Sequence, residues 1–200
     1  MPLLEAAGLA KSRGGRPVVA SASLALKRGE ILCLTGPSGS GKTTLLEMLA
    51  GILPPDRGTI RQATPPALMF QDDALIPWLS ALANITYILP RDLPPSGAAA
   101  TAAQWLERFG LEKDLLPAAL SGGMRRRLSL ARTFASGREL LLLDEPFAFL
   151  DDAWQEKVAA EITARASAGC AVLLATHSAR PLARAARTLA ISASPVVLSG

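Results

Sequence analysis

The sequence predicts an α/β protein, a three-layer sandwich around a parallel sheet with a helical lobe inserted into it. Strand-like and helix-like segments alternate along most of the chain, which is typical of this class. The runs 31–34 and 139–143 are almost purely apolar, as expected of parallel strands that are covered on both faces. A glycine-rich turn joins the first of these runs to a helical pattern, and this order places a ligand-binding loop at the edge of the sheet.

Periodicity and turn residues define the elements one by one. Glycines at positions 51 and 110 are plausible helix ends, and Ser121 is a plausible helix cap. The expected strands are 18–26, 31–35, 59–61, 67–70, 139–143, 170–175, 189–192 and 196–198. The expected helices are 43–50, 98–109, 121–136, 154–168 and 180–186.

Length and composition favour one domain. Two hundred residues, half of them hydrophobic, can bury one good core, so we expect a single unit over 1–200 with a mainly helical lobe inserted at about 72–120. The start of the chain lacks the pattern of a signal peptide, and no run of about 18 apolar residues predicts a membrane span. Cys33 and Cys170 lie far apart in apolar runs and are expected to be buried thiols in a reducing cytoplasm.

The net charge of +4 comes mostly from scattered arginines, and its densest run is Arg125 to Arg127. Such a run can mark a nucleic-acid patch. It lies on an expected helix without the interleaved aromatic residues of a stacking platform, which favours a solvated or phosphate-facing helix. No nucleic-acid partner is therefore expected.

Residues 36–43 read GPSGSGKT, a full match to the phosphate-binding pattern GxxxxGK[ST], and they predict that the chain binds a nucleoside triphosphate. In such a loop the main-chain N–H groups converge on phosphate oxygens, Lys42 reaches the β- and γ-phosphates, and the Thr43 hydroxyl can ligate Mg²⁺. The following helix adds a partial positive charge at its N-terminus. The expected nucleotide-binding residues of this loop are Gly36, Pro37, Ser38, Gly39, Ser40, Gly41, Lys42, Thr43 and Thr44.

Two carboxylates follow the leucine-rich strand, at the edge where open parallel sheets bind ligands. Asp144 is well placed to hold Mg²⁺ through water beside Thr43, and Glu145 to orient or deprotonate the water that attacks the γ-phosphate. The only histidine, His177, ends the next apolar strand and is placed to reach the γ-phosphate; taken alone, it would be interpreted as structural.

A further motif indicates a family. LSGGM at 120–124, a short helix upstream of LLLLDEP, resembles the ATP-binding subunits of ATP-binding cassette (ABC) transporters over essentially the whole chain. The resemblance implies the P-loop NTPase form of the sandwich with a small antiparallel β portion. It also implies that Gln71 belongs to the glutamine loop and ligates the metal with Thr43 and Asp144. Asp151 becomes the dimer-contact aspartate, and His177 the switch histidine, which with Lys42, Gln71 and Glu145 completes the implied catalytic set.

The implied mechanism needs a second copy of the chain. Two cassettes would meet head to tail, with each ATP between the phosphate loop of one copy and Ser121, Gly122 and Gly123 of the other. A helix N-terminus preceded by serine and glycines offers hydroxyl and N–H donors to a phosphate. ATP would close the dimer and hydrolysis would open it.

The segment starting at Phe70, FQDDALIPWLSALANI, resembles the cassettes of nitrate, sulfonate and taurine importers. The resemblance implies a transmembrane permease, a solute-binding protein and a peripheral place on the cytoplasmic face of the membrane. Pro77, Trp78 and Leu79 would receive the permease, although Trp78 can equally pack inside the lobe.

Two residues depart from the family pattern. Arg13 stands where an aromatic residue usually stacks on adenine, and arginine can also stack on a ring. Phe149 replaces a small residue in the loop before Asp151. Two rival interpretations follow: a soluble ABC protein that acts on a nucleic-acid or ribosomal partner, and a degenerate binding module with little turnover.

Overall fold

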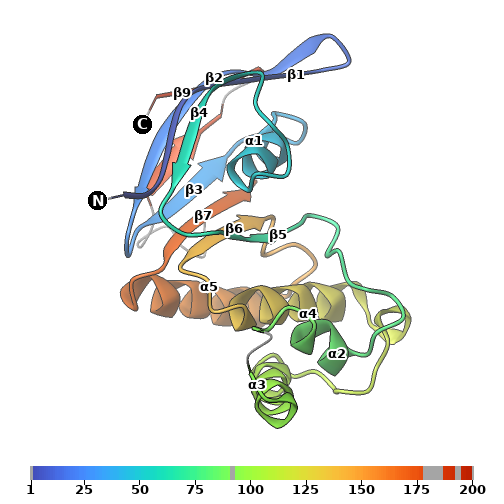
Figure 1. Ribbon diagram of the computed structural model, residues 1–200. Coiled ribbons are helices and arrows are strands. Elements are labelled where there is room, and N and C mark those ends of the chain that lie inside the picture. Colours follow the sequence, from blue (N-terminus) through green and yellow to red (C-terminus); the bar gives the residue numbers. More distant parts are fainter. Residues whose placement is uncertain (1, 91–92, 178–186, 192–194, 200) are drawn as a thin grey trace.

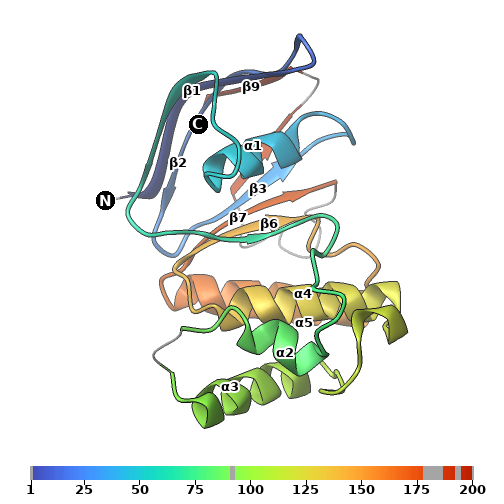
Figure 2. The same cartoon turned by 45° about the vertical axis from the view of Figure 1, so that its right-hand side comes forward.

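Two β-sheets with a helix between them form one half of the molecule, and further helices cover the outer face of the second sheet (Figures 1 and 2). This computed structural model describes residues 2–90, 93–177, 187–191 and 195–199. The first sheet has the strand order β4-β1-β2-β9, in which β9 runs parallel to β2 and the other pairs are antiparallel. Its strands are β1 (Pro2–Arg13), β2 (Arg16–Lys27), β4 (Arg57–Gln62) and β9 (Val196–Ser199).

The second sheet is parallel throughout, with the strand order β5-β6-β7-β3-β8. The carboxyl ends of its strands therefore meet at one edge, where the glycine-rich loop leaves β3 and Asp144 ends β6. Its strands are β3 (Ile31–Thr35), β5 (Ala67–Met69), β6 (Leu140–Asp144), β7 (Ala171–Thr176) and β8 (Arg187–Ala190).

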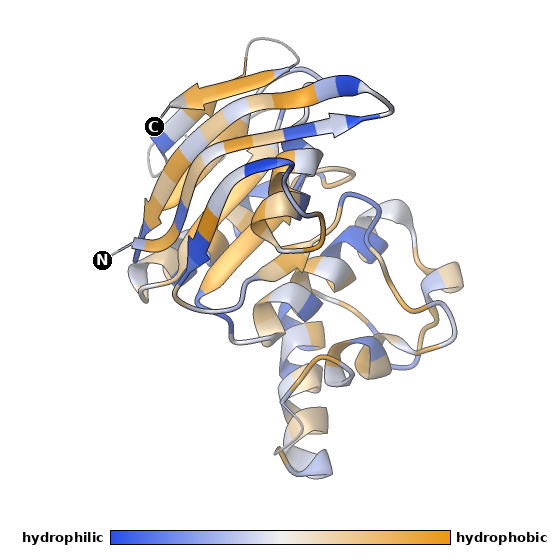
Figure 3. Ribbon diagram, turned by 45° about the horizontal axis from the view of Figure 1, so that its top comes forward, coloured by the Kyte–Doolittle hydropathy of each residue, from blue (hydrophilic) through white to orange (hydrophobic). Residues whose placement is uncertain are grey.

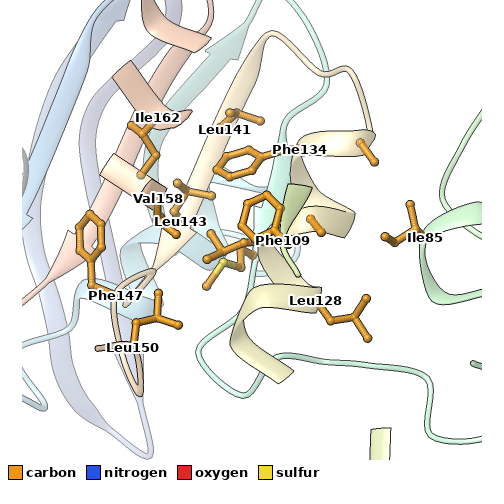
Figure 4. Packing of buried hydrophobic residues seen from close by; sticks show 14 of the residues in the cluster. Ile85, Phe109, Leu128, Phe134, Leu141, Leu143, Phe147, Leu150, Val158 and Ile162 are labelled. Atoms are coloured by element: carbon orange, nitrogen blue, oxygen red, sulfur yellow. The ribbon is translucent and has the colours of Figure 1, made fainter. Parts of the chain in front are cut away.

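Alternation along these apolar strands builds two cores, one on each face of the parallel sheet. Leu141 and Leu143 of β6 pack with the outer helices, whereas Leu140 and Leu142 pack with α1 (Lys42–Leu49) and the first sheet. All four side chains are fully buried. Figure 4 shows the outer core closing around aromatic residues, and Figure 3 shows hydrophobic residues concentrated along the strands. The continuous leucine run is thus explained by burial on both faces.

Five α-helices and one short 3₁₀ helix (Pro117–Ala119) accompany the sheets among the residues that the structure describes. The outer layer holds α4 (Gly122–Ala135) and α5 (Asp152–Ser167), and the lobe adds α2 (Ala81–Thr86) and α3 (Pro95–Arg108). The lobe is less helical than predicted, because long connections precede α2 and follow α3. Buried Asn84 holds the first connection by bonds to Ile76 and Leu79, a side-chain role that periodicity does not reveal.

Most expected elements are present within a residue or two of their predicted bounds. Strand β1 was not predicted from the sequence. Its pairing with β2 shifts register between Ala6 and Leu9, around Gly8, and such bulges break the alternation that identifies a strand. The expected helix 180–186 lies outside the described residues. Within the part of the chain that is described, no helix is long and apolar enough to span a bilayer.

Candidate functional site

The phosphate-binding loop connects β3 to α1, as its sequence predicts. Gly36 and Gly41 adopt φ angles of 157° and 99°. A Cβ atom at Gly36 would lie 2.5 Å from the carbonyl oxygen of Ile191, and one at Gly41 would lie 2.9 Å from that of Val18. Only glycine lets the main chain pass so close to its neighbours at these angles.

Two buried side chains of the loop suit an anionic ligand. The Lys42 ammonium is largely buried and donates to the carbonyl oxygens of Gly36 at 2.8 Å and Pro37 at 2.9 Å, which holds the charge inside the loop. The Ser40 hydroxyl is also buried, and it has no hydrogen-bond partner among the described residues. Because buried polar groups are normally paired, this hydroxyl fits a ligand oxygen.

Three oxygen-bearing side chains converge beside the loop. Thr43 Oγ1 donates to Asp144 Oδ2 at 2.6 Å, and Gln71 Oε1 lies 3.5 Å from the same hydroxyl. Burial raises the pKa of Asp144, whereas the hydrogen bond from Thr43 lowers it. Hydroxyl, carboxylate and amide oxygens are the donors that Mg²⁺ prefers, so the three residues fit the metal that the sequence predicts.

The next residue, Glu145, has a left-handed main chain with φ of 49°, and its N–H donates to the carbonyl oxygen of Ala175 at 2.8 Å. This turn allows adjacent acids to serve one site, although strand geometry would point them to opposite faces. Glu145 Oε2 lies 3.0 Å from Nδ1 of His177 and accepts the His177 main-chain N–H at 3.4 Å. The ends of the two neighbouring strands thus bring Glu145 and His177 into contact.

A cleft of about 300 Å³ opens where these groups meet. Arg13 lines it as expected, but its guanidinium is ion-paired with Glu47 of α1. Val18 also lines the cleft and was not singled out from the sequence, because an apolar strand residue there looks like any core residue. The lining residues are Arg13, Val18, Ser38, Gly39, Gly41, Lys42, Thr43, Thr44, Gln71, Asp144 and Glu145.

The signature residues do not line this cleft. Ser121 caps α4, its hydroxyl accepting the Met124 N–H at 3.2 Å, and it is exposed. A Cβ atom at Gly123 would lie 2.8 Å from the carbonyl oxygen of Phe149, so glycine is required for that contact. Phe149 itself is exposed and has a left-handed φ of 63°.

The arginine run behaves differently from the expectation of a solvated or phosphate-facing helix. Arg125 is exposed, but Arg126 is almost completely buried, and the Arg127 guanidinium lies 4.2 Å from the ring centre of Trp154. These side chains bind main-chain carbonyls of the lobe and of the loop after β5.

The two cysteines also differ from each other. Cys33 is buried, with a pKa raised by burial to about 11, whereas Cys170 is only half-buried and precedes its strand.

The fold is that of an ATP-binding cassette. A dimeric bacterial ABC transporter cassette superimposes with a TM-score of 0.87, covering 94% of both chains at 23% identity. A post-hydrolysis dimer of the same cassette bound to ADP and Pi gives the same TM-score over 96% of both chains.

The chain belongs to the ABC transporter family, whose model matches residues 19–148. Taurine import ATP-binding protein TauB of Pseudomonas aeruginosa is 44% identical over 72% of this chain and 59% of its own length. Aliphatic sulfonates import ATP-binding protein SsuB 3 of Paraburkholderia xenovorans is 41% identical over 85% of this chain and 68% of its own. The corresponding SsuB of Corynebacterium glutamicum is 42% identical over 75% and 63%. The chain thus spans roughly three-fifths of the length of the first relatives, and the family and fold expected from the sequence are confirmed.

Proposed function

We propose that this chain is the ATP-hydrolysing subunit of an ABC importer, a single cassette over 1–200 with the lobe at about 72–120 inserted in its core. The observation that supports it most is the meeting of Thr43, Gln71, Asp144 and Glu145 beside a complete phosphate loop. The chain that carries this cleft is 44% identical to a protein named for taurine import.

Nucleotide binding rests on the loop and on Arg13. Main-chain N–H groups of residues 36 and 38–44 and the N-terminus of α1 surround the phosphates, and Lys42 supplies a charge-assisted bond. The Arg13 guanidinium, beside the cleft, stacks on the adenine ring. Desolvation of Lys42 by the loop strengthens its attraction for phosphate oxygens.

The metal site consists of Thr43, Gln71 and Asp144. These residues would hold Mg²⁺, which when bound would neutralise charge on the phosphates, the chemistry that phosphoryl transfer needs from a cation. Burial keeps Asp144 and its hydrogen bond to Thr43 fixed, so two of the three ligands are already oriented.

Glu145 orients the attacking water and accepts its proton. His177 holds the Glu145 carboxylate through the 3.0 Å contact and reaches the γ-phosphate from the neighbouring strand end. The strained main chain of Glu145 is the kind of feature that persists where an active site requires it.

A second copy of the chain completes the site. Ser121, Gly122 and Gly123 do not line the cleft of their own chain, and they donate to the γ-phosphate held by the partner copy. Asp151 caps α5 and contacts the partner across the closed interface. ATP favours the closed dimer and its hydrolysis the open state.

Light scattering after size-exclusion chromatography of Glu145→Gln tests this proposal. The neutral amide keeps the nucleotide contacts but cannot take the proton, so ATP with Mg²⁺ is expected to double the mass from 20.9 kDa. Glu139→Gln, which alters a surface carboxylate paired with Arg28, is the matched control and is expected to hydrolyse ATP normally. A Glu145→Gln protein that binds ATP and stays monomeric would contradict the dimeric mechanism.

A transmembrane permease binds the lobe in this proposal, and a solute-binding protein delivers the solute to it. Trp78 is 77% exposed and Tyr87 71% exposed, so the site expected at Pro77, Trp78 and Leu79 presents aromatic surface, and the alternative of a packed Trp78 is not supported. Such exposed apolar groups mark protein interaction sites. The cassette then lies on the cytoplasmic face of the membrane.

Copurification with its permease tests the partner. Trp78→Ala is expected to lose most of the recovered complex while the isolated cassette keeps its melting temperature, because an exposed side chain contributes little to folding. Ile52→Ala, another exposed apolar residue (54%) but outside the lobe, is the control. The rival role with a nucleic-acid or ribosomal partner has no support from the relatives' names, and we expect no nucleic acid in the purified complex.

A further inference from the structure

The glutamine loop, residues 70–74, brings Gln71 to the metal site without regular secondary structure. Its main chain is strained: Asp73 and Ala74 adopt left-handed φ angles of 63° and 44°, which side-chain-bearing residues rarely take. Such a conformation persists only where the surroundings fix it. The position of Gln71 therefore depends on what holds this loop.

One face of α4 holds the far end of the loop. Arg132 donates to the carbonyl oxygens of Ala74 at 2.7 Å and Asp73 at 2.8 Å, and the Ser129 hydroxyl donates to that of Asp73 at 3.1 Å. Ser129 and Arg132 lie three residues apart, so they share a helix face with Arg126 one turn earlier. This face presents a row of donors to main-chain oxygens.

Arg126 holds the end of the loop that carries the glutamine. Its guanidinium donates to the carbonyl oxygens of Phe70 at 3.1 Å and Gln71 at 2.5 Å, and Nη1 lies 3.2 Å from Oδ1 of Asp73. The side chain is only 1% exposed. Burying a charge is costly unless the fold compensates it, and here the two terminal nitrogens of the guanidinium each bind a separate carbonyl oxygen, Nη1 that of Phe70 and Nη2 that of Gln71.

We propose that Arg126 is a positioning residue for the metal site, fixing the main chain of Gln71 so that its side-chain oxygen stays near Thr43. Arg126 lies on α4, whose cap is the signature residue Ser121, so its side chain joins the glutamine loop to the helix that carries the signature residues. A shift of the signature end of α4 by a partner copy would thereby be felt at the metal site. This inference rests on the proposed function, since it assigns Gln71 to the metal.

The test measures metal affinity with Arg126→Lys. Mn²⁺, a paramagnetic substitute for Mg²⁺, is titrated by electron paramagnetic resonance in the presence of a non-hydrolysable ATP analogue. Lysine keeps a positive charge near Asp73, but its single, less far-reaching ammonium replaces two Nη atoms that each bind their own carbonyl oxygen, so Mn²⁺ affinity is expected to fall about tenfold or more. Binding of the analogue in EDTA should be unchanged, because the phosphate loop is untouched.

Two further variants separate positioning from general damage. Arg127→Lys makes the same change at the next residue, where the side chain contacts Phe109, Gly110 and Trp154, and is expected to lower the melting temperature without altering Mn²⁺ affinity. Asp73→Asn removes the ion pair and leaves the carbonyl bonds. Because both carbonyl bonds of Arg126 are kept, Mn²⁺ affinity should stay within about twofold.

The outcomes distinguish this inference from the proposed function. Wild-type Mn²⁺ affinity in folded Arg126→Lys, with an active parent protein, overturns the positioning role. An equal loss of affinity in Arg127→Lys also overturns it, since any disturbance of α4 would then suffice. A parent protein that binds the analogue but hydrolyses no ATP contradicts the proposed function instead.

Discussion

The cleft beside the phosphate loop and the signature end of α4 are both built from helix N-termini, but only one is complete within this chain. In the cleft, oxygens of Gln71 and Asp144 each lie within 3.5 Å of the Thr43 hydroxyl, and the three residues come from separate segments. At the signature end, Ser121 is exposed and lines no part of the cleft. In the proposed function these are two halves of one phosphate site, and the signature end acts on the cleft of a second copy.

The cleft and the signature end of α4 also differ in how far their side chains are exposed to solvent. Asp144 is 2% exposed, and its neighbours are held by core strands, whereas Phe149 beside the signature glycines is 75% exposed. An exposed aromatic side chain is available for contact with a partner. The Asp144 carboxylate is thus enclosed by the fold of its own chain, whereas Phe149 is left at the surface.

The largest expected effect is that of Asp144→Asn, which removes a carboxylate from the cleft beside the phosphate loop. Loss of a charged metal ligand should lower ATP hydrolysis by about 100-fold or more. The same substitution should increase the stability of the folded protein at pH 7. Burial raises the pKa of Asp144, so the folded state favours the neutral carboxyl, and its stabilising contribution is lost as pH rises through the folded-state pKa.

Melting curves of the parent and of Asp144→Asn at several pH values measure this second effect. The variant is expected to melt at a higher temperature than the parent at pH 7, and the two melting temperatures should converge in acid. A lower melting temperature of the variant at pH 7 would show that the Thr43 hydrogen bond outweighs the cost of the buried charge.

A smaller effect is expected from Ser121→Ala, which tests whether the signature end acts only through a partner. Ser80 offers a matched control, because its hydroxyl caps α2 with the same 3.2 Å bond that Ser121 makes at α4. Each alanine should cost about 1 kcal/mol of stability through the lost cap. In a Glu145→Gln background, only Ser121→Ala should weaken ATP-dependent dimerisation, measured by sedimentation; equal dimerisation in both variants would remove the serine from the interface.

The residues of the cleft beside the phosphate loop could largely be predicted from short contiguous stretches of sequence. The loop sequence, the leucine strand and the acids after it are each contiguous, and the parallel arrangement that joins them follows from strands covered on both faces. Strand β1 was not predictable by alternation, because its bulges interrupt the pattern. The burial of Arg126 was also not predicted, since the carbonyl oxygens that it binds belong to a loop about 55 residues away in sequence. Burial of a charge depends on tertiary contacts that periodicity does not contain.

The smallest expected effect lies at the open rim of the cleft, where Arg13→Ala tests whether the complete half also recognises the base. The Arg13 side chain is 52% exposed and paired with Glu47, so its loss should change stability little. An exposed cation–π contact corresponds to roughly a two- to fivefold loss of ATP affinity. Inorganic triphosphate lacks the ring, and its affinity should stay constant, whereas Arg28→Ala, which removes a similarly exposed paired arginine, should affect neither ligand. An equal loss for ATP and triphosphate would mean that Arg13 acts by charge alone, and Val18, which also lines the cleft, would then be the side chain to test for packing against the adenine.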